Sequence, residues 1–496
     1  MSADIESNST GLLARPGNRI TRRIQRAWPA LWDVAALCGM LSVAQTVTAG
    51  DSPAPSGAGS ISSQGALPAS GSSFTPASSW KPAWLTDIDL TVKESYADNV
   101  FMSGVNQSSV PAGATTLKDR SSFITTVSPK LGFNFASSLD AGGNLELLSF
   151  TYAPDFAIYH SLPSENYDTH RVILEAKGKA GAFSYNLANT LLYVDASRVA
   201  PAFPGDLFNA WATINAYPRR EQLNDRSKLT LQYDWKQWFI RPGASLAYYA
   251  MMTEIKDPSL PGTPSGYQDY CTRYDVNGGA DIGYKFAPDM AATVGYRYGS
   301  QGQEQYSFSP YSSPCDYQRV LLGVEGRPCK WLNIQLLGGP EFRSYEADSA
   351  THISPLNNLH PVTYYGEAAL SAEVTPADTL TFNYKQFQFV SCLGVKPYFD
   401  STYGLSYGRK ITDRLRLDLG ARLLEANYTI GNLSTCSRDD LDYILSAGLH
   451  FALSANCAAA FGYSANLGRN AQDNIVNPQN RDFNSQEVSL GFQFKF

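Results

Sequence analysis

From residue 85 to its end, this chain alternates strand-like stretches with connections of two lengths, first long and then short. The eight short connections lie near residues 140–143, 177–181, 234–237, 286–289, 327–330, 375–378, 411–413 and 454–456. The nine long ones lie near residues 97–120, 160–168, 194–222, 253–269, 299–314, 346–359, 389–395, 425–438 and 469–481. Connections of strictly alternating length therefore join eighteen strands, and both ends of the set lie on the short-turn side. A β-sandwich or β-helix does not require connections of alternating length. Outer-membrane barrels, by contrast, combine short periplasmic turns, long outer loops and an even strand count.

The strand-like stretches have one apolar and one polar face. Leu415, Leu417 and Leu419 alternate with Arg416 and Asp418, and successive side chains of a strand point to opposite faces. An error of register would turn a whole strand over, which is implausible for so regular a stretch. The sequence predicts an all-β fold, a transmembrane antiparallel up-and-down β-barrel of about eighteen strands with short periplasmic turns and long outer loops.

Aromatic residues are abundant, with 29 Tyr and 24 Phe against 6 Met and 5 His, and they gather where the strands end. Those on the short-turn side are Phe133, Phe135, Tyr233, Trp235, Tyr284, Phe286, Phe451, Phe494 and Phe496. Those on the opposite side are Tyr96, Tyr193, Tyr298, Tyr345 and Tyr428. Tyr and Phe favour strands in general, but their bunching at strand ends favours two aromatic girdles, one at each membrane interface.

The last nine residues, V-S-L-G-F-Q-F-K-F, are apolar at every even position and small or polar at every odd one. We expect them to form the eighteenth strand, which pairs with the first strand near residues 88–92 and closes the barrel. The segment resembles the C-terminal sorting signal of bacterial outer-membrane barrels at Ser489, Gly491, Phe494 and Phe496. This resemblance implies that Gly491, Phe494 and Phe496 are read by the barrel-assembly machinery.

The N-terminus has the composition of an export signal. It carries five arginines, at positions 15, 19, 22, 23 and 26, followed by an apolar core at residues 34–44 that is too short to span a bilayer as a helix. Small residues at positions 47 and 49 place cleavage after Ala49, whereas Leu37 before Cys38 argues against a lipoprotein. We therefore predict a signal peptide at residues 1–49, a disordered Ser/Pro/Gly-rich periplasmic linker at 50–84 and a barrel in the bacterial outer membrane at 85–496.

Residues 94–101 (E-S-Y-A-D-N-V-F), a polar loop and residues 123–132 (F-I-T-T-V-S-P-K-L-G) resemble the opening hairpin of the type 2 family of β-barrel porins. With the C-terminal signal, the match brackets the barrel, although the middle of the chain carries no motif of the family. The resemblance implies an outer-membrane pore and supplies no catalytic residues.

A barrel of about eighteen strands is too wide for side chains to fill, so we expect a water-filled lumen. Its predicted pore-lining residues are polar and of both charges, because charges in a membrane segment need a wet cavity. They are Lys228, Asp275, Asp281, Arg297, Arg319, Glu325, Glu341, Arg343, Glu367, Lys385, Arg414, Arg416, Asp418 and Arg422. Such a lumen indicates passive diffusion of small hydrophilic solutes.

The formal net charge is −6 for the whole chain. Since the first 49 residues contribute five arginines and three acidic residues, the mature part is near −8, which mildly favours cations and argues against nucleic-acid partners. The expected partners are outer-membrane lipid, the barrel-assembly machinery and small hydrophilic solutes, and an oligomer is left open. The alternative is an export barrel for an exopolysaccharide or other polymer, tethered to a periplasmic partner through the linker.

The sequence gives little support for an enzymatic function, and we expect neither a catalytic residue nor a cofactor. His160 and His170 flank a loop with Asp155, Glu165 and Asp168, a set that is far more often solvated surface than an active site. The sequence has no nucleophile elbow and no phosphate-binding loop.

The longest connection, residues 194–222, is less polar than the other loops. It could fold inward and narrow the pore, or it could form an outer lid or a subunit contact.

Six cysteines remain after the signal peptide, in an oxidising compartment. Cys271 and Cys315 lie at the ends of neighbouring outer loops, and so do Cys392 and Cys436. We predict these two disulfides, and we leave the two other cysteines, at positions 329 and 457, unpaired. The absence of C-x-x-C spacing argues against a zinc site.

Deleting Phe496 should impair insertion far more than it alters the conductance of the molecules that do insert. The reason is that the terminal ring would be read during assembly and would lie at the interface, away from the lumen. The folded fraction on unheated gels and the single-channel conductance measure the two effects. An equal loss of both would contradict the assignment.

Overall fold

The structure is a computed structural model, and it describes residues 81–100, 121–139, 144–197, 220–251, 272–303, 314–346, 359–390, 397–427, 438–472 and 483–496. The predicted signal peptide and nearly all of the predicted linker lie outside these ranges. In the part of the chain that is described, no helix is long and apolar enough to cross a membrane.

The described residues form eighteen strands, one short α-helix and one 3₁₀ turn. The first nine strands are β1 (Leu85–Ala97), β2 (Ser122–Asn134), β3 (Leu145–Tyr159), β4 (Tyr167–Ala180), β5 (Phe183–Ser197), β6 (Arg220–Trp235), β7 (Trp238–Met251), β8 (Arg273–Ala287) and β9 (Met290–Gln303). The other nine are β10 (Cys315–Cys329), β11 (Leu332–Tyr345), β12 (Val362–Thr375), β13 (Asp378–Val390), β14 (Pro397–Lys410), β15 (Leu415–Asn427), β16 (Arg438–Ala452), β17 (Cys457–Gln472) and β18 (Phe483–Lys495).

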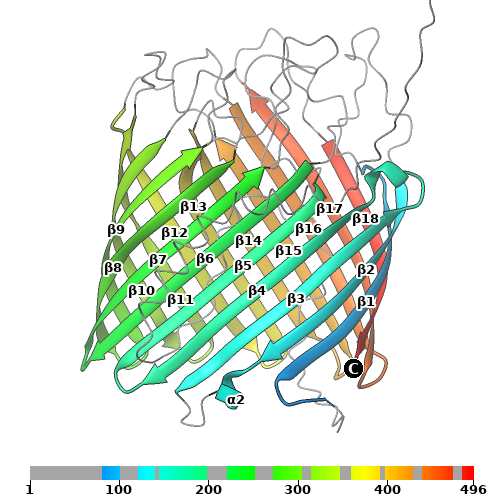
Figure 1. The fold of residues 1–496 in the computed structure, drawn as a ribbon, viewed down its shortest axis with the longest axis horizontal. Coiled ribbons are helices and arrows are strands. Elements are labelled where there is room, and N and C mark those ends of the chain that lie inside the picture. The colour runs from blue at the N-terminus through cyan, green and yellow to red at the C-terminus, as the bar shows by residue number, and fades with distance from the viewer. Residues whose placement is uncertain are drawn as a thin grey trace, which may run out of the picture. The chain divides into compact units, whose positions relative to one another are not determined.

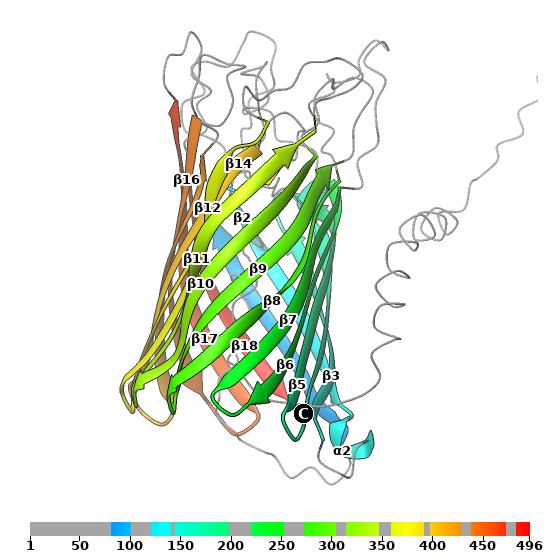
Figure 2. The same cartoon turned by 90° about the vertical axis from the view of Figure 1, so that its left-hand side faces the viewer.

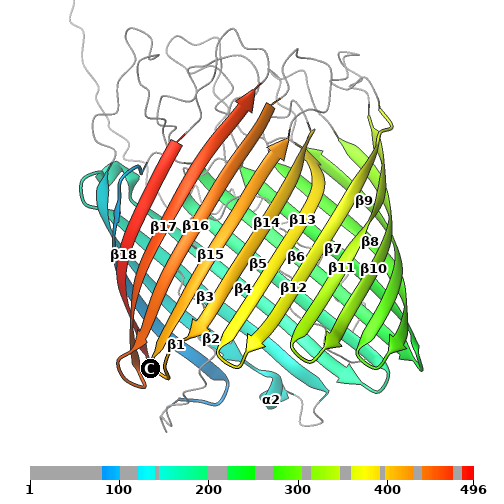
Figure 3. The same cartoon turned by 180° about the vertical axis from the view of Figure 1, so that it is seen from behind.

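Each strand pairs with its sequence neighbours, and the last strand pairs with the first, so the sheet is a closed barrel (Figures 1 and 3). All of these pairings are antiparallel. In the closing ladder, Leu90 lies opposite Phe494 and Val92 opposite Phe492. The amide of Phe496 donates to the carbonyl of Ile88 at 2.9 Å. The predicted fold class and the pairing of the C-terminal strand with the first strand are confirmed.

The short connections all lie at one end of the barrel (Figure 2). Several consist of two residues, such as Lys236–Gln237 between β6 and β7. The predicted turn at 140–143 differs, because the connection from β2 to β3 also contains the helix α2 (Ala136–Leu139). In the turn between β14 and β15, Lys410 pairs with Asp413 at 2.7 Å, and this hydrogen bond holds the pKa of Asp413 below its ordinary value.

The outer face of the barrel is apolar. In β18, Leu490 is 50% exposed and alternates with Ser489 and Gly491, as an apolar face turned toward lipid requires. Exposed rings lie at the short-turn end, on Tyr233, Trp235, Tyr284, Phe286, Phe451, Phe494 and Phe496. Tyr96 and Tyr298 are exposed toward the other end, and Tyr428 lies outside the described residues.

Tyr345 is a correction to the predicted outer girdle. It is 4% exposed and packs against Cys315. In β11 it has the same parity as Glu341 and Arg343, so its ring belongs to the inner face with them. The sequence analysis correctly placed Tyr345 near the end of a strand, but it assigned the ring to the outer face of the barrel instead of the inner face.

Gly326 marks an irregular point of β10, where the register with β11 shifts between Gly326 and Cys329. Its φ is +128°, and a Cβ atom there would lie 1.9 Å from the carbonyl oxygen of Asp289. Only glycine adopts this conformation without strain.

Gly326→Ala should therefore lower the free energy of unfolding by roughly 1–3 kcal/mol. Urea titration of the barrel folded in lipid vesicles measures the change. Gly278→Ala is the matched control, since the nearest atom to its added Cβ is 3.7 Å away. Equal effects of the two substitutions would contradict the strain argument.

Candidate functional site

The inner face of the barrel is recognised by contacts between strands that are not neighbours. Arg241 of β7 binds Glu325 of β10 through both terminal guanidinium nitrogens, one of them at 2.8 Å, although two strands separate β7 from β10. Such a contact can form only inside the barrel. Glu325 is therefore on the inner face, as the alternation with exposed apolar residues also indicates.

Nearly all predicted pore-lining residues lie on this inner face. They are Lys228 of β6, Asp275 and Asp281 of β8, Arg297 of β9, Arg319 and Glu325 of β10, Glu341 and Arg343 of β11, Glu367 of β12, Lys385 of β13, and Arg416, Asp418 and Arg422 of β15. Arg414 differs, because it lies in the exposed turn before β15 and not on a strand. That these residues line a conducting pore stays a prediction.

Two ion pairs of the inner face lie outside the main cluster of charges. Arg297 pairs with Asp281 on the neighbouring strand at 2.8 Å. On the other side of the barrel, Arg416 pairs with Asp418 at 2.7 Å, and His450 of β16 lies 3.4 Å from the same carboxylate. Charges of both signs are therefore spread around the wall, as the sequence indicated.

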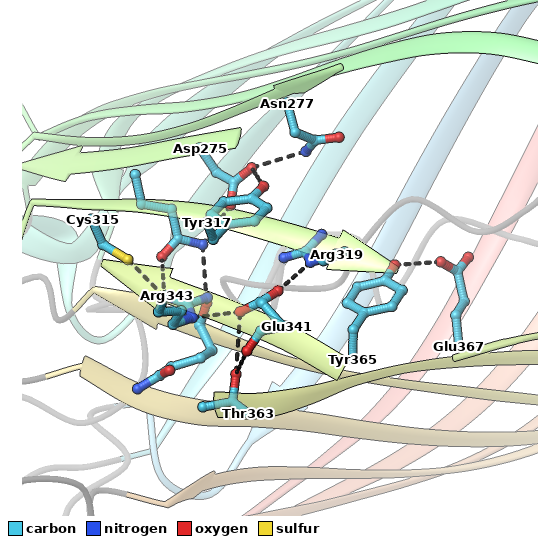
Figure 4. A network of polar contacts seen from close by, with 12 residues as sticks. Asp275, Asn277, Cys315, Tyr317, Arg319, Glu341, Arg343, Thr363, Tyr365 and Glu367 are labelled. Carbon is cyan, nitrogen blue, oxygen red and sulfur yellow. Dashed lines mark hydrogen bonds and ion pairs between the residues drawn. The ribbon is translucent and has the colours of Figure 1, made fainter. Parts of the chain in front are cut away.

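The main cluster occupies the inner face of β8 to β13, and Figure 4 shows its central part. Asp275 accepts three hydrogen bonds there. The donors are the Tyr317 hydroxyl at 2.9 Å, the Gln301 amide at 2.5 Å and the Asn277 amide at 3.1 Å. A carboxylate with this many donors is held in a fixed position.

Arg319 lies between two aromatic rings. The centre of its guanidinium is 4.2 Å from the Tyr317 ring and 4.3 Å from the Tyr365 ring, which are cation–π distances. It also donates to Glu341, which in turn accepts from Arg343. Buried charges are costly unless they are paired and fully hydrogen-bonded, and this arrangement meets both conditions for Glu341.

Arg343 is fully buried, with 0% of its side chain exposed. Besides Glu341, its guanidinium donates to Gln301 Oε1 at 3.0 Å, to the Tyr345 hydroxyl at 3.3 Å and to the main-chain carbonyl of Gln388 at 2.6 Å. The last contact is the unusual one. It joins β11 to a backbone atom of β13 across the inner side of β12.

This contact reflects an inward fold of the β13–β14 hairpin. The ladder between β12 and β13 begins only at Gly366 and Gln386, although β12 is described from Val362 onward. In the described ladders, residues 387–390 pair with residues 397–400 of β14 and with no residue of β12. The end of this hairpin comprises residues 387–390 and 397–398. We call these six residues the hairpin tip.

The hairpin tip lies against the inner face of β8 to β11. The Gln388 carbonyl also accepts from Gln301 of β9 at 3.0 Å, and Cα atoms of β13 and β9 come within 8 Å of each other. Phe389 is 2% exposed and lies 4.5 Å from the Arg273 guanidinium, which also donates to the Tyr398 hydroxyl at 3.3 Å. The tip thus occupies part of the space enclosed by the wall.

Sequence reasoning missed the hairpin tip and its partners Gln301 and Arg273. It also missed Arg241, which binds Glu325. One signal was available. Parity places Phe387 and Phe389 on the polar inner face beside Lys385, where aromatic residues have no reason to lie unless they pack against something. The connection that could narrow the pore or form an outer lid or subunit contact, residues 194–222, lies outside the described residues from 198 to 219.

The two histidines weighed as catalytic candidates take part in structural contacts. His170 contacts the Tyr152 hydroxyl at 2.8 Å and Asp168 at 2.7 Å, one with each ring nitrogen. His160 lies 2.8 Å from Thr125 Oγ1 and 3.6 Å from Glu94. Among the residues that the structure describes, no group of three or more His, Cys, Asp or Glu side chains could hold a metal ion.

The structure differs from the cysteine prediction at one of the two proposed disulfides. Cys315 is a free, buried thiol 3.7 Å from an Arg343 nitrogen, so the Cys271–Cys315 disulfide is not formed in this structure. Cys329 and Cys457 are also free thiols. Cys271, Cys392 and Cys436 lie outside the described residues, and the Cys392–Cys436 disulfide stays a prediction.

Comparison with solved structures returns outer-membrane proteins. OpdK of Pseudomonas aeruginosa has a TM-score of 0.37 and 10% identity, covering 83% of this chain and 99% of that chain. OccK2 (OpdF) of the same organism, in complex with glucuronate, gives 0.37 and 10%, covering 83% and 98%. The siderophore receptor PirA of Acinetobacter baumannii gives 0.36 and 7%, covering 83% and 81%.

No family model matches the chain, and no curated protein matches it. The assignment of the fold therefore rests on the closed strand pairing described above. That pairing confirms the membrane-barrel architecture implied by the resemblance to type 2 β-barrel porins.

Arg343→Gln should release the hairpin tip and raise the single-channel conductance. A hydrogen bond from a charged donor contributes about 1.5–3 kcal/mol, so its loss should shift the balance between docked and released tips by roughly tenfold or more. Arg297→Gln is the control, because Arg297 pairs with Asp281 and does not touch the tip. Conductance unchanged in Arg343→Gln, with normal folding, would show that the tip does not limit passage.

Proposed function

We propose that this protein is an outer-membrane channel through which small hydrophilic solutes diffuse, narrowed from within by the hairpin tip and by charged side chains. The observation that carries the proposal is the set of contacts across the lumen. They join β7 to β10, β8 to β14 and β9 to β13, pairs of strands with two, five and three other strands between them in the sheet.

The chemistry of the two faces supports a water-filled passage. The outer face carries exposed apolar and aromatic side chains, whereas the inner face carries carboxylates, guanidinium and ammonium groups. In a membrane, charges at this density are stable only next to water or in ion pairs. Because both signs are present, the wall can discriminate among charged solutes without closing to neutral ones.

The rival function is an export barrel for a polymer with a periplasmic partner. A polymer chain has to thread the lumen along its whole length, and the hairpin tip occupies part of that path. The inward contacts therefore favour passage of small solutes. An enzyme is the weaker candidate, since the histidines are engaged in contacts with neighbouring strands.

Reconstitution of the purified barrel in planar bilayers and in liposomes tests the proposal. We expect stable single-channel conductance and swelling of liposomes in a pentose solution, with exclusion of a large dextran. Liposomes containing the heat-unfolded protein are the control. Absence of conductance and of swelling in correctly folded samples would refute the channel.

A gene deletion separates the two candidate functions. Loss of surface polymer from the deletion strain, combined with no swelling of liposomes, would favour the export barrel. Normal surface polymer with slower uptake of small solutes would favour the channel.

A further inference from the structure

We propose that a row of basic side chains on the inner face of β14 to β16 contacts passing solutes and gives the channel a preference for small anions. The row consists of Lys410, Arg416 and His450, at the short-turn end of three neighbouring strands (Figure 3). We call it the basic row. The proposal rests on the proposed function and names the residues that determine which solutes pass.

Arg416 is exposed to the lumen, unlike the arginines of the main cluster. Arg343 and Arg319 have 0% and 7% of their side chains exposed, because the wall and the hairpin tip cover them. Arg416 is 40% exposed, although it pairs with Asp418. A solute in the lumen can therefore touch Arg416, whereas the charges of the main cluster are already enclosed by protein.

The register of the strands aligns the basic row. Lys410 lies opposite Arg416 in the β14–β15 ladder, and Arg416 lies opposite His450 in the β15–β16 ladder. Residues directly opposite each other point to the same side of a sheet, with Cβ atoms about 4.5–5.5 Å apart. All three side chains therefore lie side by side on the inner face.

Positive charge is in excess around the basic row. Among the described residues of β14 to β17 and their turns, the inner-face and turn side chains that carry or can carry charge, from Asp418 to the short-turn end, are Lys410, Asp413, Arg414, Arg416, Asp418 and His450. Asp413 lies 2.7 Å from Lys410, and Asp418 lies 2.7 Å from Arg416 and 3.4 Å from His450. Three cations thus share two carboxylates, and protonation of the histidine adds a further positive charge.

Small side chains leave the wall open next to the basic row. The next row in register is Gly408, Asp418, Gly448 and Gly462, and the row after it is Ser406, Gly420, Ser446 and Ser464. Both Ser406 and Ser446 are exposed. A solute that moves along this face meets small or hydroxylated side chains and then the basic row.

The guanidinium of Arg416 has donors left for an anion. Its Nε and one terminal nitrogen bind Asp418, at 2.9 Å and 2.7 Å, and an arginine carries five N–H donors in all. The formal net charge of −6 mildly favours cations, but charges farther from a solute than the Debye length of about 8 Å are screened. The local excess of cations therefore decides the selectivity.

Ion selectivity of the full-length protein in planar bilayers tests the proposal. We expect the reversal potential in a KCl gradient to indicate anion preference. Arg416→Gln should lower the ratio of anion to cation permeability by roughly twofold or more, because it removes an exposed cation from the wall. Asp418→Asn should raise the same ratio.

Arg409→Gln is the matched control. Arg409 is the sequence neighbour of Lys410 and pairs with Asp378 at 3.6 Å, but alternation places it on the outer face. The substitution removes the same charge at the same end of the barrel without changing the lumen. The permeability ratio should stay as in the wild type.

Thiol labelling tests whether solutes reach this face. We expect the membrane-impermeant reagent sodium (2-sulfonatoethyl) methanethiosulfonate to lower the conductance of Ser446→Cys channels. Thr293→Cys should not react, since Thr293 is on the inner face of β9 but is 7% exposed. The wild type gives the background from the native cysteines.

The basic row would be refuted as the selective element by cation preference of the wild type. Equal shifts in Arg416→Gln and Arg409→Gln, or no shift in either Arg416→Gln or Asp418→Asn, would refute it as well. Conducting Ser446→Cys channels that the reagent leaves unchanged would show that solutes do not reach this face. Absence of any wild-type conductance would instead refute the channel itself, so the two failures are distinguishable.

Discussion

The hydrogen-bonded ladder between β1 and β18 is the constraint on which the rest of this structure depends. In lipid, a backbone amide or carbonyl without a partner costs several kcal/mol, so a sheet can lie in a membrane only when it has no edge. The pairing that extends from Asp89 opposite Lys495 to Ala97 opposite Glu487 removes the last edge of the sheet. Once the ring is closed, alternation divides every strand into a face toward lipid and a face toward an enclosed space.

Enclosure permits the dense polar chemistry of the inner wall. Arg319, Glu341 and Arg343 are almost completely buried, yet each engages hydrogen bonds or ring faces supplied by neighbouring strands. Removing one partner from such a group would leave a charge uncompensated, which is far more destabilising than replacing the whole group by apolar residues. The cluster therefore behaves as one unit that fixes the relative positions of β8 to β13.

Much of this architecture could be predicted from the sequence, because it depends on local patterns. The alternation of apolar and polar residues predicted which side chains of residues 415–419 and of the C-terminal strand lie on the outer face of the barrel. The alternating lengths of the connections predicted the number of strands. Contacts made in space had no such local signal. Nothing in the sequence brings Arg343 to the Gln388 carbonyl, because their proximity depends on a hairpin leaving the wall. Cys315 near an outer loop looked available for a disulfide, but its thiol lies among buried side chains.

Because the hairpin tip folds inward, part of the barrel wall lacks the ladder between β12 and β13. Val362 to Tyr365 of β12 pair with β11 but with no residue of β13 in the described ladder. Over this stretch, a strand in the middle of the chain has the hydrogen bonding of an edge strand. Segments held by one ladder open locally at lower free energy than those held by two. The barrel wall therefore has a stretch that opens more readily than a doubly paired strand, and this stretch is distant from the junction between the first and last strands.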